Sequence, residues 1–585
     1  MFLTLLLLAV GSSVSKAAIA SPVFGVTSSP DGIDGQSYDY IVIGGGTAGL
    51  TVASRLSEDP AVSVLVVEAG ADDRDNPEVF DIYEFTAAFF GPLDWAYPAE
   101  EGRTINSGKT LGGSSSINGG LWTRGSMAQY DAWTTLLEES DADVGWNWNG
   151  LFPYMRKSEH FLPPNADQIT KGAEFDPAVH GSSGPVFSSF SHGIAGHPNC
   201  VTMNPLSINY DANDLRSSSA QSYLTPVENT RMNWVTLVQH LVTKIVWSQT
   251  TIPLVASGIE FATYTNTTNG TTRYTAHARK EVILAAGAIR SPAILQLSGV
   301  GDSDLLGPLN ITTLLDLKTV GKNLQEQTNT AMACGGTGFP VDGTGPDDTI
   351  AYPNLFQLFG NASNAKVAEL ESSIPEWAAS QAVNAYSAEA LETIFRAQAD
   401  IVLTDKAPMI EMYYVTGPNV TFDQIAVNLW QLLPFSRGQV AIVSTDPFEY
   451  PNIHVNYFNV SFDLDIQVAG LKLLRKIFRT PPISDLSTGE TVPGAAVPDD
   501  AEGGSDADWE AYIMANFGSV MHPVGTTAML RRELGGVVDA HLKVYDTANV
   551  RVVDASIFPI QLSAHLSATV YGVAEKAADL IKAAQ

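Results

Sequence analysis

Residues Tyr38 to Gly49 read YDYIVIGGGTAG, and this stretch decides the fold. The apolar and aromatic residues 38–43 are typical of a buried strand, and the glycine-rich turn after them leads into a segment, 50–56, that is expected to be helical. Residues 62–67 form a second buried strand. Strand, helix and strand within about 30 residues predict a βαβ unit, whose parallel strands belong to a doubly wound α/β sheet.

The glycines of this turn have the spacing Gly44-x-Gly46-x-x-Gly49. The first permits a tight turn, the second lets the backbone approach a pyrophosphate, and the third lets helix and strand pack closely. The N-terminus of the helix then favours an anion. Glu68 ends the second strand, where a carboxylate can accept hydrogen bonds from ribose hydroxyls and would repel a 2′-phosphate. We therefore predict a dinucleotide site that disfavours NADP, the alternative being a turn that serves packing alone.

Two later segments distinguish FAD from NAD. Residues 108–124 read GKTLGGSSSINGGLWTR, and residues 287–301 read GAIRSPAILQLSGVG after a buried strand. With these segments the chain resembles the glucose–methanol–choline (GMC) oxidoreductases, from about Tyr38 to Leu580, and most of all the secreted fungal branch with glucose oxidases, glucose dehydrogenases and aryl-alcohol oxidases. The resemblance implies alcohol oxidation with FAD, which we expect to be bound without a covalent link. It also implies an α/β fold, α+β overall: a Rossmann-like FAD-binding domain with a parallel sheet, and a substrate domain with a mostly antiparallel sheet covered by helices.

The same resemblance assigns cofactor contacts residue by residue. Beside the motif glycines, the pyrophosphate contacts are Thr47, Ala48, Asp554 and Ala555; the adenosine ribose contacts are Glu68 and Ala69; the flavin contacts are Asn118, Gly119, Gly120, Leu121, Ser567 and Ala568; further cofactor contacts are Trp95 and Val242.

Two histidines are the candidates for the reacting centre. His522 lies in the segment MHPVGT and His565 in SAHLS, and both segments match family motifs. An alcohol releases hydride readily only as its hydroxyl proton leaves, so a base with the pKa range of imidazole is suited to the reaction. The resemblance makes His522 the base and His565 its partner, and repulsion between two imidazolium ions requires that one ring be neutral. Glu411 matches a carboxylate that orients the second histidine; the alternative is an ordinary surface glutamate.

The expected substrate follows from a departure from the family pattern. Sugar-specific relatives have an arginine and an asparagine where this chain has Gly518 and Val520. A site without these groups would leave sugar hydroxyls unpaired. We therefore expect a primary aryl, allylic or heterocyclic alcohol, such as an intermediate of secondary metabolism. Tyr413 and Trp430 are expected to wall the pocket, although either residue could equally be core.

Three alternatives stay open at this point. Glucose or another sugar is the second candidate substrate, for an oxidase or a dehydrogenase. An NAD-dependent dehydrogenase and a non-catalytic, FAD-stabilised secreted protein are the other classes. The sequence leaves the electron acceptor, oxygen or another compound, and the oligomeric state undecided.

Composition and targeting signals indicate the compartment. The net charge of −31 disfavours nucleic acid and anionic lipid as partners. An apolar run followed by small residues predicts a signal peptide at 1–20, and no later segment is long and apolar enough to span a membrane. We therefore expect a secreted glycoprotein. The N-glycosylation sequons are Asn266, Asn269, Asn310, Asn361, Asn419 and Asn459.

The two cysteines, Cys200 and Cys334, allow one disulfide without proving it, and no cluster has the spacing of a metal site. The chain is expected to begin with a signal peptide at 1–20 and a disordered lead-in at 21–37. Residues 38–330 are expected to form mainly the FAD-binding domain, with insertions of the substrate domain, and residues 331–485 mainly the substrate-binding domain, with aromatic strands and at least one amphipathic helix near 365–400. An acidic, glycine-rich linker is expected at 486–507, and the catalytic histidines with the return to the FAD-binding domain at 508–585.

Overall fold

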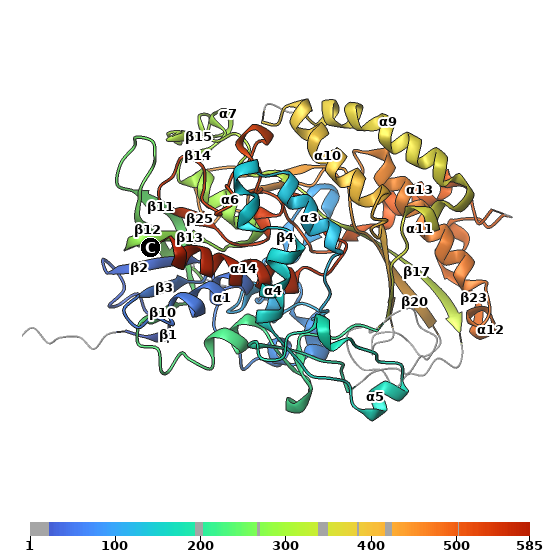
Figure 1. Ribbon diagram of the computed structural model, residues 1–585, viewed down its shortest axis with the longest axis horizontal. Coiled ribbons are helices and arrows are strands. Elements are labelled where there is room, and N and C mark those ends of the chain that lie inside the picture. The colour runs from blue at the N-terminus through green and yellow to red at the C-terminus, as the bar shows by residue number, and fades with distance from the viewer. Residues whose placement is uncertain are drawn as a thin grey trace, which may run out of the picture.

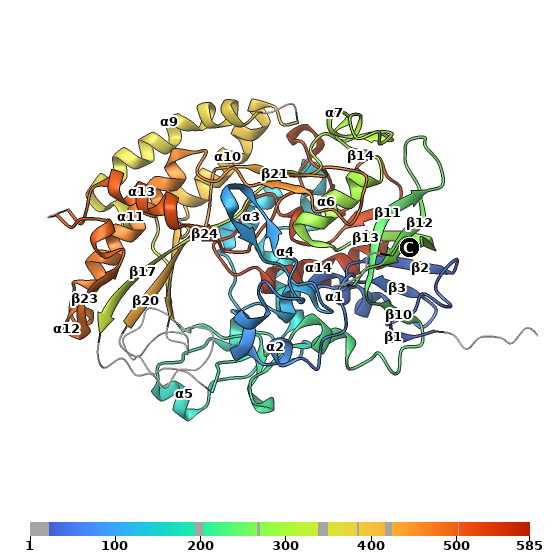
Figure 2. The same cartoon turned by 180° about the vertical axis from the view of Figure 1, so that it is seen from behind.

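The structure is a computed structural model that describes residues 23–192, 203–265, 270–336, 349–382, 385–415, 424–500 and 502–584. The expected signal peptide, Cys200 and the sequons Asn266, Asn269 and Asn419 lie outside the described residues. In Figures 1 and 2 a mostly parallel sheet lies at one end of the molecule and an antiparallel sheet at the other.

The first sheet has eight strands in the described chain, in the order β1-β10-β3-β2-β13-β12-β11, with β25 beside β13. All pairings from β1 to β13, and that of β25, are parallel, whereas β11, β12 and β13 pair antiparallel. Its strands are β1 Gly25–Thr27, β2 Ser37–Ile43, β3 Val64–Val67, β10 Trp234–Leu237, β11 His240–Trp247, β12 Ala256–Thr263, β13 Tyr274–Leu284 and β25 Val550–Val552.

The predicted βαβ unit is β2, helix α1 (Thr47–Leu56) and β3. β3 is buried at all four positions, as its continuous apolar run requires in a sheet covered on both faces. A side chain at Gly49 would place its Cβ 2.0 Å from the carbonyl oxygen of Gly44. Gly49 therefore lets α1 start directly against the end of β2.

The prediction that residues 21–37 form a disordered lead-in is wrong for part of this segment. Residues 25–27 form β1, which pairs in parallel with β10 at the edge of the sheet, and Ile33 is fully buried. The hydrogen bonds to β10 order a stretch whose serine, glycine and proline content suggested a flexible chain.

Within the residues that the structure describes, the second sheet has six strands, in the order β18-β19-β20-β17-β23, with β24 beside β17. All of these pairings are antiparallel. The strands are β17 Thr328–Gly336, β18 Thr349–Ala351, β19 Ile410–Val415, β20 Gln424–Gln431, β23 Ser487–Val492 and β24 Gly518–Ser519. Helices gather on one side of this sheet in Figure 1, among them α9 Ser363–Gln381, α10 Ala388–Leu403, α11 Ser461–Phe478 and α13 Asp506–Asn516.

Two helices, α9 and α10, cover the region near 365–400, where at least one amphipathic helix was expected. The second helix has its own N-cap, because the Ser387 hydroxyl accepts a hydrogen bond from the Ala390 N–H. The expected linker at 486–507 is also wrong in part, since it contains β23, the last strand of the sheet. The buried Arg475 holds this segment through Glu490, at 2.6 Å, and through the carbonyls of Val497 and Gly503.

The C-terminal part returns to the first sheet. β25 adds to β13, and helix α14 (Ser567–Ala583) lies against α1 and α4 (Trp148–Ser158) (Figure 1). No helix in the described ranges has the length and apolar character needed to cross a membrane.

The remaining elements are short or connect the two sheets: α2 Pro77–Phe80, α3 Met127–Thr135, α5 Ala166–Thr170, α6 Gly287–Leu297, α7 Ser303–Leu306, α8 Leu355–Phe359, α12 Ile483–Leu486, β4 Tyr97–Pro98, β5 Thr104–Ile105, β6 Glu159–Phe161, β7 Val186–Ser188, β8 Ile208–Asn209, β9 Leu215–Arg216, β14 Val300–Gly301, β15 Leu315–Asp316, β16 Lys322–Leu324, β21 Gly438–Ala441 and β22 Asn452–His454.

Candidate active site

A cavity of about 490 Å³ extends from the carboxyl edge of the parallel sheet to the antiparallel sheet. Its lining includes Ile43, Val67 and Ala285, where β2, β3 and β13 end. Ligands of doubly wound sheets bind at this edge. At the other end the lining includes Asn428 and Trp430 of β20.

Nearly all of the expected cofactor contacts line this cavity. The exceptions are Gly49, which packs under the turn, and Ala568, which is fully buried in a cluster with Trp122, Tyr223 and Tyr571. The lining residues from that set are Gly44, Gly46, Thr47, Ala48, Glu68, Ala69, Trp95, Asn118, Gly119, Gly120, Leu121, Val242, Asp554, Ala555 and Ser567.

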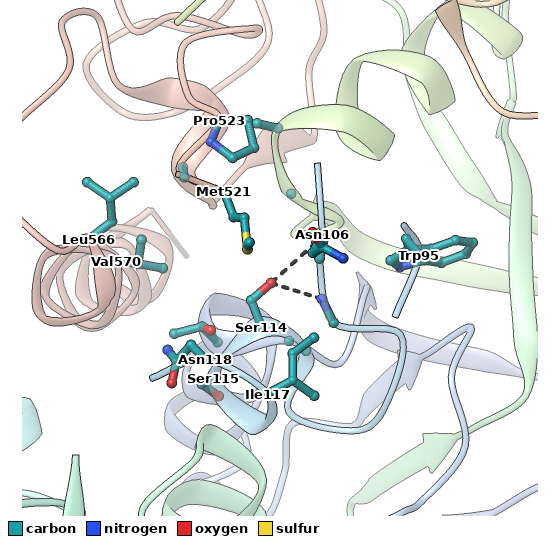
Figure 3. A pocket seen from close by; sticks show the side chains of 18 of the residues that line it. Trp95, Asn106, Ser114, Ser115, Ile117, Asn118, Met521, Pro523, Leu566 and Val570 are labelled. Carbon is teal, nitrogen blue, oxygen red and sulfur yellow. Dashed lines mark hydrogen bonds between the residues drawn. The ribbon is translucent and has the colours of Figure 1, made fainter. Parts of the chain in front are cut away.

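Two glycine-rich turns meet at the nucleotide end of the cavity. Gly44 has a φ of +102°, and a Cβ there would lie 2.5 Å from the Ala285 carbonyl oxygen. A Cβ on Gly113 would lie 2.8 Å from the Cα of Gly46. The Ser114 hydroxyl accepts a hydrogen bond from the Gly108 N–H at 3.1 Å and lies 3.3 Å from the Ser107 hydroxyl, as Figure 3 shows. Backbone rather than side chains therefore forms this wall.

The N-termini of three helices line the same cavity. α1 begins at Thr47, α6 at Gly287 and α14 at Ser567, and all three residues are part of the lining. The first turn of each helix has N–H groups without intrahelical partners and a partial positive charge, although at α6 the Gly287 N–H donates to Asp554. These termini, the close glycine turns and the length of the cavity fit a dinucleotide with a pyrophosphate.

Asp554 fixes one of these termini. Its carboxylate accepts hydrogen bonds from the Gly287 N–H at 2.9 Å and from the Ser291 hydroxyl at 2.6 Å. Burial raises the pKa of Asp554, although these donors oppose the shift. In this structure Asp554 thus positions the start of α6 and also lines the cavity.

Glu68 lies at the end of β3, as predicted, and is almost completely buried. Its two carboxylate oxygens accept hydrogen bonds from the N–H groups of Gly45 and Gly70, each at 2.7 Å. Burial raises the pKa of Glu68 to about 7. Each oxygen keeps a further lone pair for a hydroxyl donor in the cavity.

The two predicted histidines lie together at the other end of the cavity. The ring centroids of His522 and His565 are 5.5 Å apart, and the rings are nearly perpendicular, at 85°. Burial and the neighbouring His565 lower the pKa of His522 to about 3, so this ring is neutral near pH 7. Met521, the residue before it, has a φ of +69° and projects towards the Ser114 loop in Figure 3.

Separate partners hold each histidine. Nδ1 of His522 lies 2.8 Å from Oε1 of Gln327, and its backbone N–H donates to Glu326 at 3.1 Å. Nε2 of His565 lies 2.9 Å from Oε1 of Glu411. Glu411 is fully buried, so the surface-glutamate alternative is wrong. Burial raises the pKa of Glu326 to about 8.

Aromatic rings wall the space around the histidines. The Trp430 ring lies 5.0 Å from His565 and 5.9 Å from His522, and Tyr413 stacks on Trp430 at 5.3 Å. Both aromatic residues and Val520 line the cavity, so neither aromatic is only core.

Several lining residues were not found from the sequence, among them Asn329, Asn428, Ser519, Phe85 and Arg290. Asn428 stands two residues before Trp430 on β20, and side chains two apart share one face of a strand, so this spacing could have indicated it. Nothing in the sequence indicated that Glu326 and Gln327 lie beside the site, because two polar residues before a strand can be either buried or exposed.

Comparisons with known proteins agree with this geometry. GMC oxidoreductase family models match residues 38–329 and 434–574. A GMC oxidoreductase family protein of Malassezia sympodialis, Mala s 12, is 36% identical over 94% of this chain and 93% of its own length, and a Penicillium chrysogenum glucose oxidase is 34% identical over 95% and 93%.

Solved structures show the same likeness. An FAD-dependent oxidoreductase from Chaetomium thermophilum superposes with a TM-score of 0.82 at 28% identity, covering 94% of this chain and 99% of its own. A fungal aryl-alcohol oxidase gives 0.81 at 29% identity, covering 93% and 98%.

The doubly wound sheet, the glycine turns and the family matches together define an FAD-dependent oxidoreductase that acts on alcohols. More particularly, the chain belongs to the GMC oxidoreductase family.

Proposed function

We propose that this enzyme oxidises a primary alcohol whose carbinol carbon is attached to an aryl, allylic or heterocyclic group, with His522 as the base. The observation that carries the proposal is the pair of nearly perpendicular imidazoles 5.5 Å apart beside the ring of Trp430. FAD, which the glycine turns would hold, would accept the hydride, and with it both electrons, from the carbinol carbon.

The protein contributes a base and a second polar group. The neutral ring of His522 takes the hydroxyl proton as the C–H bond breaks, and its low pKa keeps it unprotonated in neutral solution. His565 holds the substrate oxygen, while Glu411 fixes the orientation of that ring through Nε2. His565 is buried and His522 is partly buried, which limits the water that can compete for the oxygen atom.

The walls of the site support a flat, conjugated substrate. Val520 presents an apolar side chain beside His522, and a Cβ built on Gly518 would meet nothing within 4 Å. Trp430 and Tyr413 offer ring faces on which a conjugated alcohol could stack. The similar fold of the aryl-alcohol oxidase is consistent with this choice.

A sugar is the second candidate, on separate observations. Asn329, Asn428 and Ser519 add polar side chains to the lining, and a glucose oxidase is among the relatives at 34% identity. The side-chain amides of Asn329 and Asn428 could bind sugar hydroxyls for which Gly518 and Val520 offer no hydrogen-bonding group.

Anaerobic competition between benzyl-type alcohols and glucose tests the choice. Each alcohol is mixed separately with the enzyme, all alcohols at the same concentration, and the flavin absorbance is followed over time. We expect faster bleaching by the conjugated alcohol, by a factor on the order of 10² or more, since each unsatisfied hydroxyl costs about 1–3 kcal/mol. Faster bleaching by glucose would transfer the assignment to sugars, and bleaching by no alcohol would favour a non-catalytic protein. Admitting air then tests oxygen as the acceptor.

We also propose that the protein is secreted and N-glycosylated. The apolar run at residues 2–10 supports export, and the described sequon asparagines Asn310, Asn361 and Asn459 are all exposed. A mass shift on glycosidase treatment of protein from the culture medium tests both points.

A further inference from the structure

One buried amide joins the segments that carry the two histidines. Gln327 is fully buried in the stretch between β16 and β17. Its backbone carbonyl accepts a hydrogen bond from the Val520 N–H, and its Nε2 donates to the carbonyls of Leu432, at 2.9 Å, and Leu562, at 3.0 Å. Its Oε1 faces Nδ1 of His522 at 2.8 Å.

These contacts allow only one orientation of the Gln327 amide. Turning it over would place Oε1 against two carbonyl oxygens, and all three atoms are acceptors. Because Nε2 is fixed by the two carbonyls, the atom that meets His522 is an oxygen. An oxygen acceptor at 2.8 Å requires a proton on Nδ1.

We propose that Gln327 is a positioning residue that fixes the tautomer of His522, with the proton on Nδ1 and the lone pair of Nε2 directed to the alcohol. This inference rests on the proposed role of His522 as base. His522 lines the cavity, and no hydrogen bond of the described residues occupies Nε2. When the substrate reacts, its O–H bond breaks, an N–H bond forms at Nε2, and the electron pair of the C–H bond leaves with the hydride to FAD.

Other titratable groups around His522 do not set its tautomer. His565 faces it across the cavity, Glu411 lies behind His565, Tyr413 lies beyond Trp430, and Glu326 binds the backbone N–H of His522 rather than its ring. The ring of His522 therefore depends on Gln327 alone among these groups for its Nδ1 partner.

The direct test is the ¹⁵N spectrum of the ring in wild-type holoenzyme labelled at histidine, with His522→Ala used to assign the signals. We expect a protonated Nδ1 and an unprotonated Nε2 at neutral pH. A protonated Nε2 would overturn the proposal, and this measurement needs no variant of Gln327 to fold.

Two variants test the consequence. Gln327→Met removes the acceptor and should slow flavin reduction by a factor on the order of 10 to 10², with FAD content unchanged. In Gln327→Glu the oxygen that meets the Leu432 and Leu562 carbonyls must carry a proton, which leaves the other oxygen as a neutral acceptor for Nδ1. This variant should therefore recover most of the rate that Gln327→Met loses. The wild-type rate should be flat from about pH 5 upward, because a base with a pKa of about 3 is protonated only below that range.

Gln325 provides the matched control. It is equally buried, donates to the carbonyls of Asn323 and Pro559, accepts from the Gln561 N–H, and does not touch the His522 ring. Gln325→Met should lose stability but keep the wild-type pH profile. Flavin reduction in Gln327→Glu that is as slow as in Gln327→Met overturns the inference, whereas undiminished reduction in His522→Ala overturns the proposed function itself.

Discussion

The two ends of the cavity are built in different ways. At the nucleotide end, glycine turns form much of the wall: a Cβ on Gly44 or on Gly113 would collide with neighbouring backbone, and helices α1 and α6 begin there. At the reacting end, the wall is side chains. His522 and His565 reach their partners Gln327 and Glu411 across 195 and 154 residues of sequence.

The difference shows what each end must recognise. A pyrophosphate is bound by backbone N–H groups, which every residue except proline has, so the sequence must supply close approach of the backbone and therefore glycine. A hydroxyl proton needs one atom of known basicity, so the sequence must supply a side chain and the group that orients it. A substitution at the reacting end should therefore impair the chemical step, and a substitution at the nucleotide end should impair FAD binding.

His522→Ala should separate the two ends most strongly. Flavin reduction should slow by a factor on the order of 10² or more, because the base is lost, while FAD stays bound. Stopped-flow bleaching and the flavin absorbance per protein measure the two effects. His541→Ala, an exposed histidine, is the control. Near wild-type bleaching in His522→Ala would remove the residue from its role.

Glu68→Ala should affect the nucleotide end instead. The loss of a charged acceptor for the ribose should weaken FAD binding by a factor on the order of 10 to 10², because such hydrogen bonds contribute about 1.5–3 kcal/mol. Two buried N–H groups also lose their acceptor, so some stability is lost. Fluorescence of released FAD on dilution measures the affinity, with exposed Asp72→Ala as control. Unchanged retention would argue against a ribose contact.

Glu411→Gln should have a smaller effect at the reacting end. The amide can still accept from Nε2 of His565, but the charge that orients the ring is gone. We expect reduction to slow by a factor on the order of 10, with the FAD affinity unchanged. Exposed Glu371→Gln on α9 gives the reference rate. An equal loss of FAD would show that the two ends are not separable at this residue.

Glu490→Gln should affect neither end. It weakens the contact of β23 with the buried Arg475 and should lower the free energy of unfolding by about 1–2 kcal/mol. Thermal unfolding measures the loss, with exposed Glu502→Gln as the comparison. A change in flavin reduction would mean that β23 communicates with the cavity.

The same contrast explains what the sequence could predict. The βαβ unit and its glycine turn were predicted because their spacing has a physical reason, and both histidines were predicted because their segments match family motifs. Gln327 and the polar residues Asn329 and Asn428 were missed, because burial beside the site depends on strand pairing across the chain. The strands β1 and β23 were missed for a related reason: their composition favours loops, and only hydrogen bonds to β10 and β17 order them.

The return of the C-terminal segment to the first sheet has a consequence for how the protein is made. β25 pairs with β13, α14 packs on α1, and Ser567 at the start of α14 forms part of the cavity wall. A ribosome therefore exposes β2, α1 and β3 long before the strand and helix that complete their core. The early half must wait partly folded, with apolar surface open, until residues 550–583 emerge, which is a stage at which multidomain chains depend on chaperones.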